Sequence, residues 1–90
     1  MMYVYIFTED YQEILTQLLP NAKPHRFGGL ACLIIENDIH VVRGLAEVVS
    51  QILGVDVSSR LEDEIVDFLS ENEYIHLDAF IRICLEEIDA

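Results

Sequence analysis

The residues of this chain that could do chemistry are three histidines, two cysteines and a large number of carboxylates. Metal sites built from these residue types use short motifs such as HxxxH or CxxC. His25, His40 and His76 form no such pair with each other or with Cys32 and Cys84. The sequence therefore predicts neither a metal site nor a cofactor, and both cysteines, which lie in apolar runs, are expected to be buried thiols.

The sequence also contains no recognisable motif for nucleophilic catalysis or nucleotide binding. A nucleophilic Ser or Cys needs a base beside it, and Ser58-Ser59 is better explained as the start of a helix. Gly28-Gly29 lacks the spacing and the Lys-Ser/Thr of a phosphate-binding loop. We therefore expect that the protein is not an enzyme.

The most distinctive pattern is a run of carboxylates between residues 62 and 71. Asp63, Asp67 and Glu71 recur every four residues, so that on a helix they share one face at intervals of about 6 Å. Like charges at this spacing weaken a helix by roughly 0.2–0.5 kcal/mol per pair, a cost without an obvious structural return. We predict that this acidic run binds a partner, the alternative being a solvated helix face. The predicted partner-binding residues are Glu62, Asp63, Glu64, Asp67 and Glu71.

The charge of the chain points to the kind of partner. A formal net charge of −12 comes from 17 acidic and 5 basic residues, and residues 46–90 hold most of the acids. Such a chain is repelled by nucleic acids and anionic membranes and attracted by basic surfaces. We therefore predict a protein partner with a basic surface and no direct contact with nucleic acid or membrane. The alternative is that the acidity only keeps an apolar protein soluble.

The acidic run also permits a second function. The interval between Asp63, Asp67 and Glu71 is close to that between successive phosphates on one DNA strand, a resemblance that small acidic inhibitors encoded by phages use. In this alternative the chain mimics the charge of a nucleic acid. It would then block a protein that binds nucleic acids.

The apolar content suggests that the chain associates with a further layer. Ninety residues form one domain, residues 1–90, with a modest core, yet 52% of the residues are hydrophobic and the mean hydropathy is +0.30. Leu30–Ile35 is apolar throughout, which is typical of a strand covered on both faces. A homodimer or a docked partner would cover the surplus apolar surface. The alternative is a monomer with ordinary exposed apolar atoms.

The sequence gives no indication of export or membrane insertion. The opening residues MMYVYIF have no basic region and no small-residue cleavage site. No apolar run approaches the roughly 20 residues that a membrane helix needs. We expect a cytoplasmic protein.

The first 29 residues predict a strand, a helix and a loop. Tyr3–Phe7 is aromatic and β-branched, as strands are. Thr8 offers an N-cap oxygen for a helix that Pro20 ends. Residues 21–29 are predicted to be a loop, and Gly28-Gly29 allows a turn into the next strand.

The centre of the chain allows two interpretations. Leu30–Ile35 is a strand in both. In the first, Asn37-Asp38 closes a tight turn and Ile39–Arg43 returns as a second strand. In the second, Asp38 is the N-cap of one helix over Ile39–Leu53.

Two observations favour the hairpin. Ile39, Val41 and Val42 are β-branched, which suits a strand. Gly44 lies where that strand would end, and a glycine inside a helix costs about 1 kcal/mol. In both interpretations a helix over Leu45–Leu53 follows.

The last half of the chain predicts helices only. The helix that contains Leu45–Leu53 ends at Gly54. Ser58 or Ser59 is expected to cap the next helix, and Ser59 matches a capping box with Glu62. The last helix begins near Leu77. The apolar stripe of the middle helix consists of Leu61, Ile65, Phe68 and Leu69. The predicted fold is therefore α+β: an N-terminal strand and helix, a central β-hairpin, then three helices packed on a small sheet.

A pattern near the C-terminus resembles one in a known family. The chain matches part of a Tyr-Ile-x-x-Asp-Gly-Phe segment followed by Phe-Arg-Leu, at Tyr74, Ile75, Asp78, Phe80 and Leu85. In this respect it resembles the tail of the YtxC-type sporulation proteins of spore-forming bacteria. The match fails at two places. Ala79 stands where the family has Gly, and Ile83-Cys84 stands where the family has Phe-Arg. The resemblance covers about a third of the chain, and the family's members are far longer. It implies no activity, because that family has no established chemistry.

Overall fold

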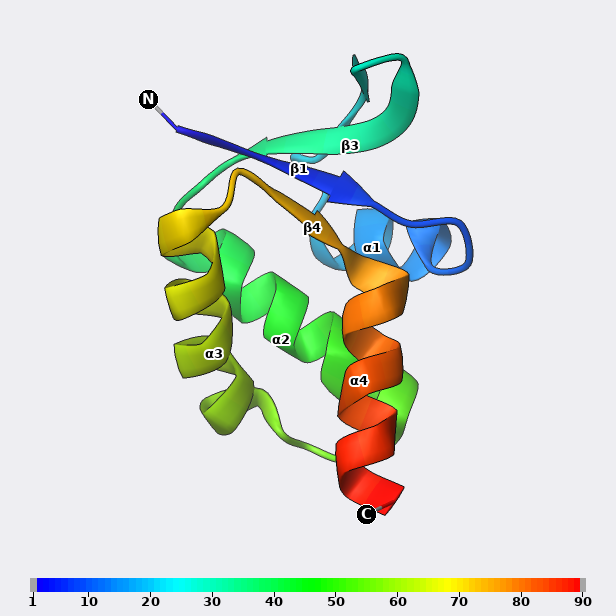
Figure 1. Ribbon diagram of the computed structural model, residues 1–90, viewed down its shortest axis with the longest axis vertical. Helices are drawn as coiled ribbons and strands as arrows, with labels where there is room; N and C mark the ends of the chain where they lie inside the picture. The colour runs from blue at the N-terminus through cyan, green and yellow to red at the C-terminus, as the bar shows by residue number, and fades with distance from the viewer. Residues whose placement is uncertain (1, 90) are drawn as a thin grey trace.

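The computed structural model describes residues 2–89, with side chains described as far as residue 87 (Figure 1). Helices and strands occur together in one unit, which confirms the predicted α+β class. The elements of the described residues, in chain order, are β1 (Tyr3–Phe7), α1 (Gln12–Leu18), β2 (Lys23–Phe27), β3 (Leu30–Glu36), α2 (Ile39–Leu53), α3 (Ser58–Glu71), β4 (Tyr74–His76) and α4 (Leu77–Asp89).

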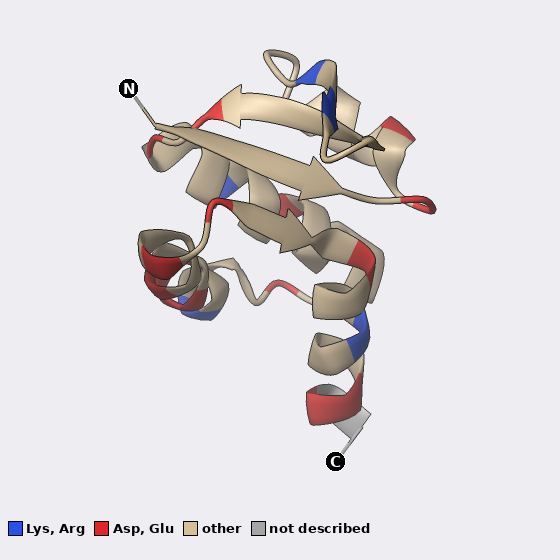
Figure 2. Ribbon diagram, turned by 45° about the horizontal axis from the view of Figure 1, so that its top comes forward, with Lys and Arg blue, Asp and Glu red and all other residues tan. Residues whose placement is uncertain are grey.

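The strands form one mixed sheet in the order β2-β3-β1-β4. β1 pairs antiparallel with β3, with Val4 opposite Ile35, and parallel with β4, with Ile6 opposite Ile75. The helices lie on one side of this sheet, as Figures 1 and 2 show from two directions. The sheet therefore has one face that packs on the helices and one open face.

Helix α2 lies at the centre of the core. It buries apolar side chains on most of its turns, and the sheet supplies the layer that packs against them. Burying a side chain of this size contributes roughly 1.5–3 kcal/mol, so this contact is a large part of the stability. The buried residues of α2 and of the sheet include Val41, Val42, Leu45, Val48, Val49, Val4, Ile6, Leu33, Ile35 and Ile75.

The preferred prediction of a central hairpin is wrong, because Ile39–Leu53 is the single helix α2. The Asp38 carboxylate accepts hydrogen bonds from the backbone N–H groups of His40 (2.9 Å) and Val41 (3.2 Å), and so caps the helix. Gly44 is buried inside it, where an added Cβ would lie 2.3 Å from Leu19 Cδ2. The close approach that glycine allows therefore offsets its low helix propensity.

A hairpin does occur, but earlier in the chain. The prediction of a loop is wrong for Lys23–Phe27, which forms β2 and pairs antiparallel with β3. Gly28 and Gly29 make the expected turn, with φ values of 58° and 83°. Glycine populates this left-handed region without strain, which explains both residues.

Two predictions in the second half need correction. Tyr74–His76 forms β4, which was not expected; a strand of three residues is too short to show a period. The capping box of Ser59 and Glu62 does not form. Instead, Asp56 Oδ1 accepts hydrogen bonds from the backbone N–H (3.1 Å) and the hydroxyl (2.7 Å) of Ser58.

β3 is covered on one face only, contrary to the prediction from its unbroken apolar run. Leu33 and Ile35 are buried, whereas Leu30 is 61% exposed and Cys32 and Ile34 are half-buried on the other face. The helices cover only the first of these faces. The open face of the sheet therefore carries apolar side chains.

We expect Gly44→Ala to destabilise the protein by about 1–3 kcal/mol, because the new methyl group overpacks against the buried Leu19 side chain. In an open helix the same substitution stabilises by about 1 kcal/mol, so the sign tests the contact. Urea denaturation of the single variants and of Gly44→Ala/Leu19→Ala measures the coupling, and the double variant should lose less than the sum. A Gly44→Ala protein as stable as the wild type would contradict the close packing.

Candidate functional site

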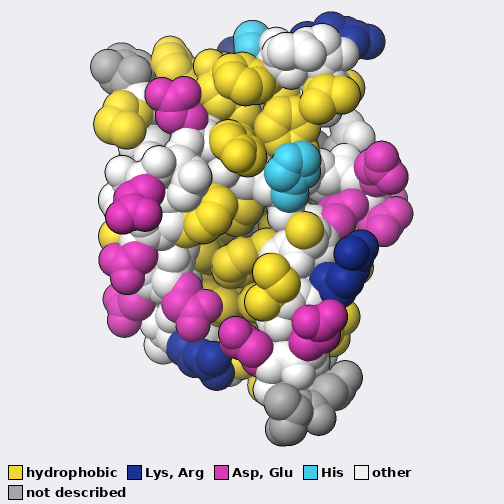
Figure 3. Space-filling view, in the orientation of Figure 1, with side chains coloured by type: hydrophobic (Ala, Val, Ile, Leu, Met, Phe, Trp, Pro, Cys, Tyr) yellow, Lys and Arg dark blue, Asp and Glu magenta, His cyan; other side chains and the backbone are white. Residues whose placement is uncertain are grey.

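Three carboxylates of the predicted site stand on the outer face of α3. The helix packs on α2 through a buried stripe of Leu61, Ile65 and Leu69. Asp63, Asp67 and Glu71 lie on the opposite side of the helix and are exposed. Figures 2 and 3 show carboxylates along this helix. The structure thus brings these three residues, here called the α3 ridge, together on one solvent-facing surface.

Glu64 borders the ridge but already has a cationic neighbour. Arg60 Nε lies 3.5 Å from Glu64 Oε1, and Arg60 Nη2 lies 3.1 Å from Glu87 Oε2 of α4. Exposed ion pairs such as these contribute about 0–1 kcal/mol. Arg60 therefore links α3 to α4 and reduces the negative charge at one end of the ridge.

Glu62 does not belong to the ridge. Successive helical residues are rotated by about 100°, which places Glu62 on the α2 side of the helix, where it is half-buried. There it lines a separate cleft of about 570 Å³ with Arg43 and Glu47 of α2. The structure therefore divides the five predicted residues between two surfaces.

An apolar stripe lies beside the ridge, between α3 and α4. Phe68 follows Arg60 and Glu64 at helical intervals of four, so it lies on the side of α3 that faces α4. It is 36% exposed, which corrects the prediction that it is buried. Figure 3 shows hydrophobic side chains between the carboxylates of the two helices. Phe80 and Ile83 lie seven and four residues before Glu87, which meets Arg60, and therefore share the side of α4 that faces α3. We define the apolar stripe as Phe68, Phe80 and Ile83; Cys84, on the same side of α4, is buried.

Cys84 is buried between these charged groups. Burial raises the pKa of its thiol, the carboxylates of Glu87 and Glu64 raise it further, and the Arg60 guanidinium opposes this rise in part. Burial likewise raises the pKa of Cys32, which is half-buried rather than buried as predicted. A raised pKa leaves less of the reactive thiolate at neutral pH. At neutral pH, both cysteines therefore carry less thiolate than a solvent-exposed thiol would.

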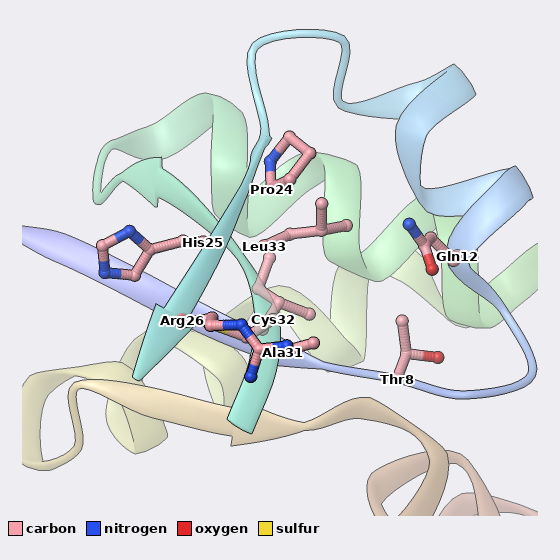
Figure 4. A pocket seen from close by; sticks show the side chains of 9 residues that line it. Thr8, Gln12, Pro24, His25, Arg26, Ala31, Cys32 and Leu33 are labelled. Carbon is pink, nitrogen blue, oxygen red and sulfur yellow. The ribbon is translucent and has the colours of Figure 1, made fainter. Parts of the chain in front are cut away.

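A cleft of about 400 Å³ opens at the β2–β3 hairpin, beside the start of α1. Figure 4 shows that Thr8 and Gln12 lie at one end of it and His25 at the other, pointing away from them. A catalytic base must lie within hydrogen-bond reach of the group that it activates. The polar side chains of this cleft do not converge in that way.

The three histidines lie apart from one another in sequence and are exposed. His40 is at the start of α2, whereas His25 and His76 lie on strands at opposite edges of the sheet. Among the residues that the structure describes, no group of three His, Cys, Asp or Glu is placed to hold a metal ion.

The open face of the sheet carries a layer of rings that the sequence interpretation missed. Tyr5 lies 4.5 Å from Phe27, measured between ring centroids, and 5.6 Å from His25. Phe7 is stacked on His76 at 5.0 Å. The sequence of Tyr3–Phe7 could have predicted that these rings share a face. Aromatic and aliphatic residues alternate there, and alternate residues of a strand point to opposite faces of the sheet.

Comparison with known proteins gave no matching family model, no similar curated protein and no similar solved structure. Within the described residues, no helix combines the length and the apolar character needed to cross a membrane.

Asp78 is a carboxylate with a structural role, in the first turn of α4. It accepts hydrogen bonds from the Thr8 hydroxyl (2.5 Å) and from the backbone N–H groups of Glu9 (2.9 Å) and Asp10 (3.2 Å). Partial burial raises the pKa of this carboxyl, but these hydrogen bonds and the charge of Arg82 outweigh burial and lower the pKa. Asp78 therefore ties the β1–α1 connection to α4.

We expect Asp78→Ala to lower the free energy of unfolding at pH 7 by about 1–3 kcal/mol, because the three donors lose a charged acceptor. Asp78→Asn should lose less, since its amide oxygen still accepts. Because the pKa is lower in the folded state, the stabilisation is present above the unfolded-state value of about 3.9 and disappears as the pH falls through the folded-state pKa. Urea denaturation between pH 7 and pH 3 measures this, and an Asp78→Ala deficit that does not shrink in acid would contradict it.

Proposed function

We propose that this chain is a non-catalytic protein-interaction domain that binds a protein with a basic surface through the α3 ridge. The observation that carries the proposal is the exposure of Asp63, Asp67 and Glu71 on one face, where none of the three forms a salt bridge among the described residues. The salt bridges of the described residues join Arg60 to Glu64 and Glu87, and none reaches the ridge. A basic partner would relieve the repulsion that these carboxylates exert on each other.

The apolar stripe would supply the uncharged centre of this contact. Protein interfaces combine an apolar core with a polar rim. Here Phe68 and Ile83 are 36% and 55% exposed, with the ridge on one side and Glu87 on the other. This arrangement favours a partner in which Lys or Arg residues flank apolar side chains. It is the combination of the two features, rather than acidity alone, that supports a docking surface.

The regular interval of the ridge also supports the second candidate, mimicry of nucleic-acid charge. The ridge extends for about 12 Å along α3, and Arg60 lies near its beginning. In this case the partner would be a protein that binds nucleic acids, and the chain would occupy its basic groove. The two candidates differ in what competes for the partner, because only the mimic would be displaced by DNA or RNA.

Neutralising the ridge should weaken binding to the partner. The ridge variant is Asp63→Asn/Asp67→Asn/Glu71→Gln, and the matched control with the same change in charge is Glu9→Gln/Asp10→Asn/Glu13→Gln, which alters three exposed acids near α1. Wild type, ridge variant and control are each used to capture proteins from a lysate of the source organism at low and high salt. Each captured protein is then purified as a candidate partner, and its association kinetics with the three chains are measured. We expect a candidate that wild type and control retain and the ridge variant loses, with slower association and a flatter salt dependence.

The ridge variant should unfold at the same denaturant concentration as the wild type or higher, because it removes two like-charge pairs worth roughly 0.2–0.5 kcal/mol each. Lost binding would then not reflect lost structure. Equal capture by wild type and ridge variant would overturn the proposal and leave the ridge as a solvated face. Displacement of the chain from its partner by duplex DNA or by RNA would favour the mimic.

A further inference from the structure

The open face of the sheet presents aromatic and aliphatic side chains from all its strands. Ring contacts join Tyr5 to Phe27 on one side of β1, and Phe7 to Tyr74 (6.3 Å between centroids) on the other. The register places Ile34 of β3 opposite Tyr5. The layer therefore runs across the sheet from β2 to β4. It is separate from the α3 ridge, so the inference drawn from it does not depend on the proposed function.

This layer is exposed in the single chain. Leu30 is 61%, Tyr74 43% and Phe27 41% exposed. Aromatic side chains bury roughly 150–250 Å² each when they go from fully exposed to covered, so at these exposures Phe27 and Tyr74 each have on the order of 60–100 Å² left to bury. A standard interface buries about 800 Å² on each partner. The open face is therefore smaller than a standard interface and fits a weak contact that depends on concentration.

The charge of the open face differs from that of the molecule. Strand residues alternate between the two faces of a sheet. By this alternation, the Lys, Arg, Asp and Glu residues that the described strands place on the open face are Lys23 and Glu36. Figure 2 shows the strands largely without charged residues, and most carboxylates on the helices and at the strand ends. The face is thus close to neutral in a chain with a net charge of −12.

This distribution identifies a second copy of the chain as the occupant that fits. Two acidic chains repel each other over most of their surfaces. They can approach with least repulsion when the two open faces meet, because the helices that carry most carboxylates then lie on the outside. Sheets packed face to face are about 10 Å apart, with interdigitated side chains. Such a contact would also cover the second face of β3, whose apolar run predicted cover on both sides.

Single-stranded nucleic acid fits this face less well. Rings on a sheet can stack with bases, but such sites also need a positively charged groove for the phosphates. Arg26 lies on the other side of β2 by alternation, and its guanidinium donates to the carbonyl oxygen of Gly29 (2.8 Å). Among the described strands, Lys23 is therefore the one Lys or Arg residue on the open face.

We propose that the chain forms a symmetric homodimer in which the open faces of two sheets pack against each other. A two-fold axis lets the same patch serve both copies. Phe27, Tyr74 and Leu30 are buried by the partner copy, and the two sheets form the inner layers. The α3 ridges stay exposed on the outside of the dimer.

Sedimentation equilibrium over a range of concentrations, at low and high salt, tests the dimer. We expect the apparent mass to rise from one chain towards two with concentration, and the dimer to be tighter at high salt, because salt screens the repulsion between the acidic copies. Binding of a basic partner to the ridge should weaken with salt. The opposite signs make a failure of this proposal distinguishable from a failure of the proposed function.

Two variants place a carboxylate in the open face: Tyr74→Glu and Phe27→Glu. Each should weaken the dimer by at least about tenfold, because the contact would bury a carboxylate that has no cationic partner there. The matched control is Val66→Glu, on α3, where the side chain is 46% exposed and the added charge is the same; it should leave the dimer unchanged. Circular dichroism verifies that each variant is folded.

Three results would overturn the proposal. The first is a wild-type chain that stays monomeric at every concentration and salt. The second is a dimer that Tyr74→Glu and Phe27→Glu do not weaken relative to Val66→Glu. The third is binding of a single-stranded RNA oligonucleotide by the wild type that the same two variants abolish, which would assign the open face to base stacking.

Discussion

The pairing of β1 with a strand on each side is the constraint on which the core and the open face of the sheet both depend. The register with β3 and β4 sends Val4 and Ile6 towards the helices and Tyr5 and Phe7 towards the open face. A slip of one residue would exchange these two sets, and would place aromatic rings where the core now holds compact aliphatic side chains. The same hydrogen bonds therefore determine the core and the aromatic layer at once.

The helices separate charge from apolar surface. Because α2 occupies the centre, α3 and α4 bury one stripe each against the core and turn their carboxylates outwards. Two carboxylates are exceptions: Glu62 lies on the α2 side of α3, and Asp78 accepts the hydrogen bonds that hold the β1–α1 connection against α4. The result is a chain with an acidic helical side and a nearly neutral sheet face. Two surfaces of such different chemistry are suited to different partners.

The fold class followed from local patterns, but the central element did not. β-branched residues and the cost of Gly44 favoured a strand at Ile39–Arg43, and both are statements about local propensity. The Asp38 cap and the contact of Gly44 with Leu19 reversed that balance, and the second of these is visible only once the chain is folded. β4 was missed for a related reason: its three residues are a strand because β1 lies beside them.

The candidate site shows the same division between local and tertiary information. Spacing by four residues is a property of the helix itself, so the grouping of Asp63, Asp67 and Glu71 could be predicted. Whether a neighbouring side chain joins them depends on what packs against the helix: α2 covers the side that holds Glu62, and α4 borders the side that holds Phe68. The alternation of β1 likewise showed which rings share a face. Only the placement of all the helices on one side of the sheet decides that this face is the open one.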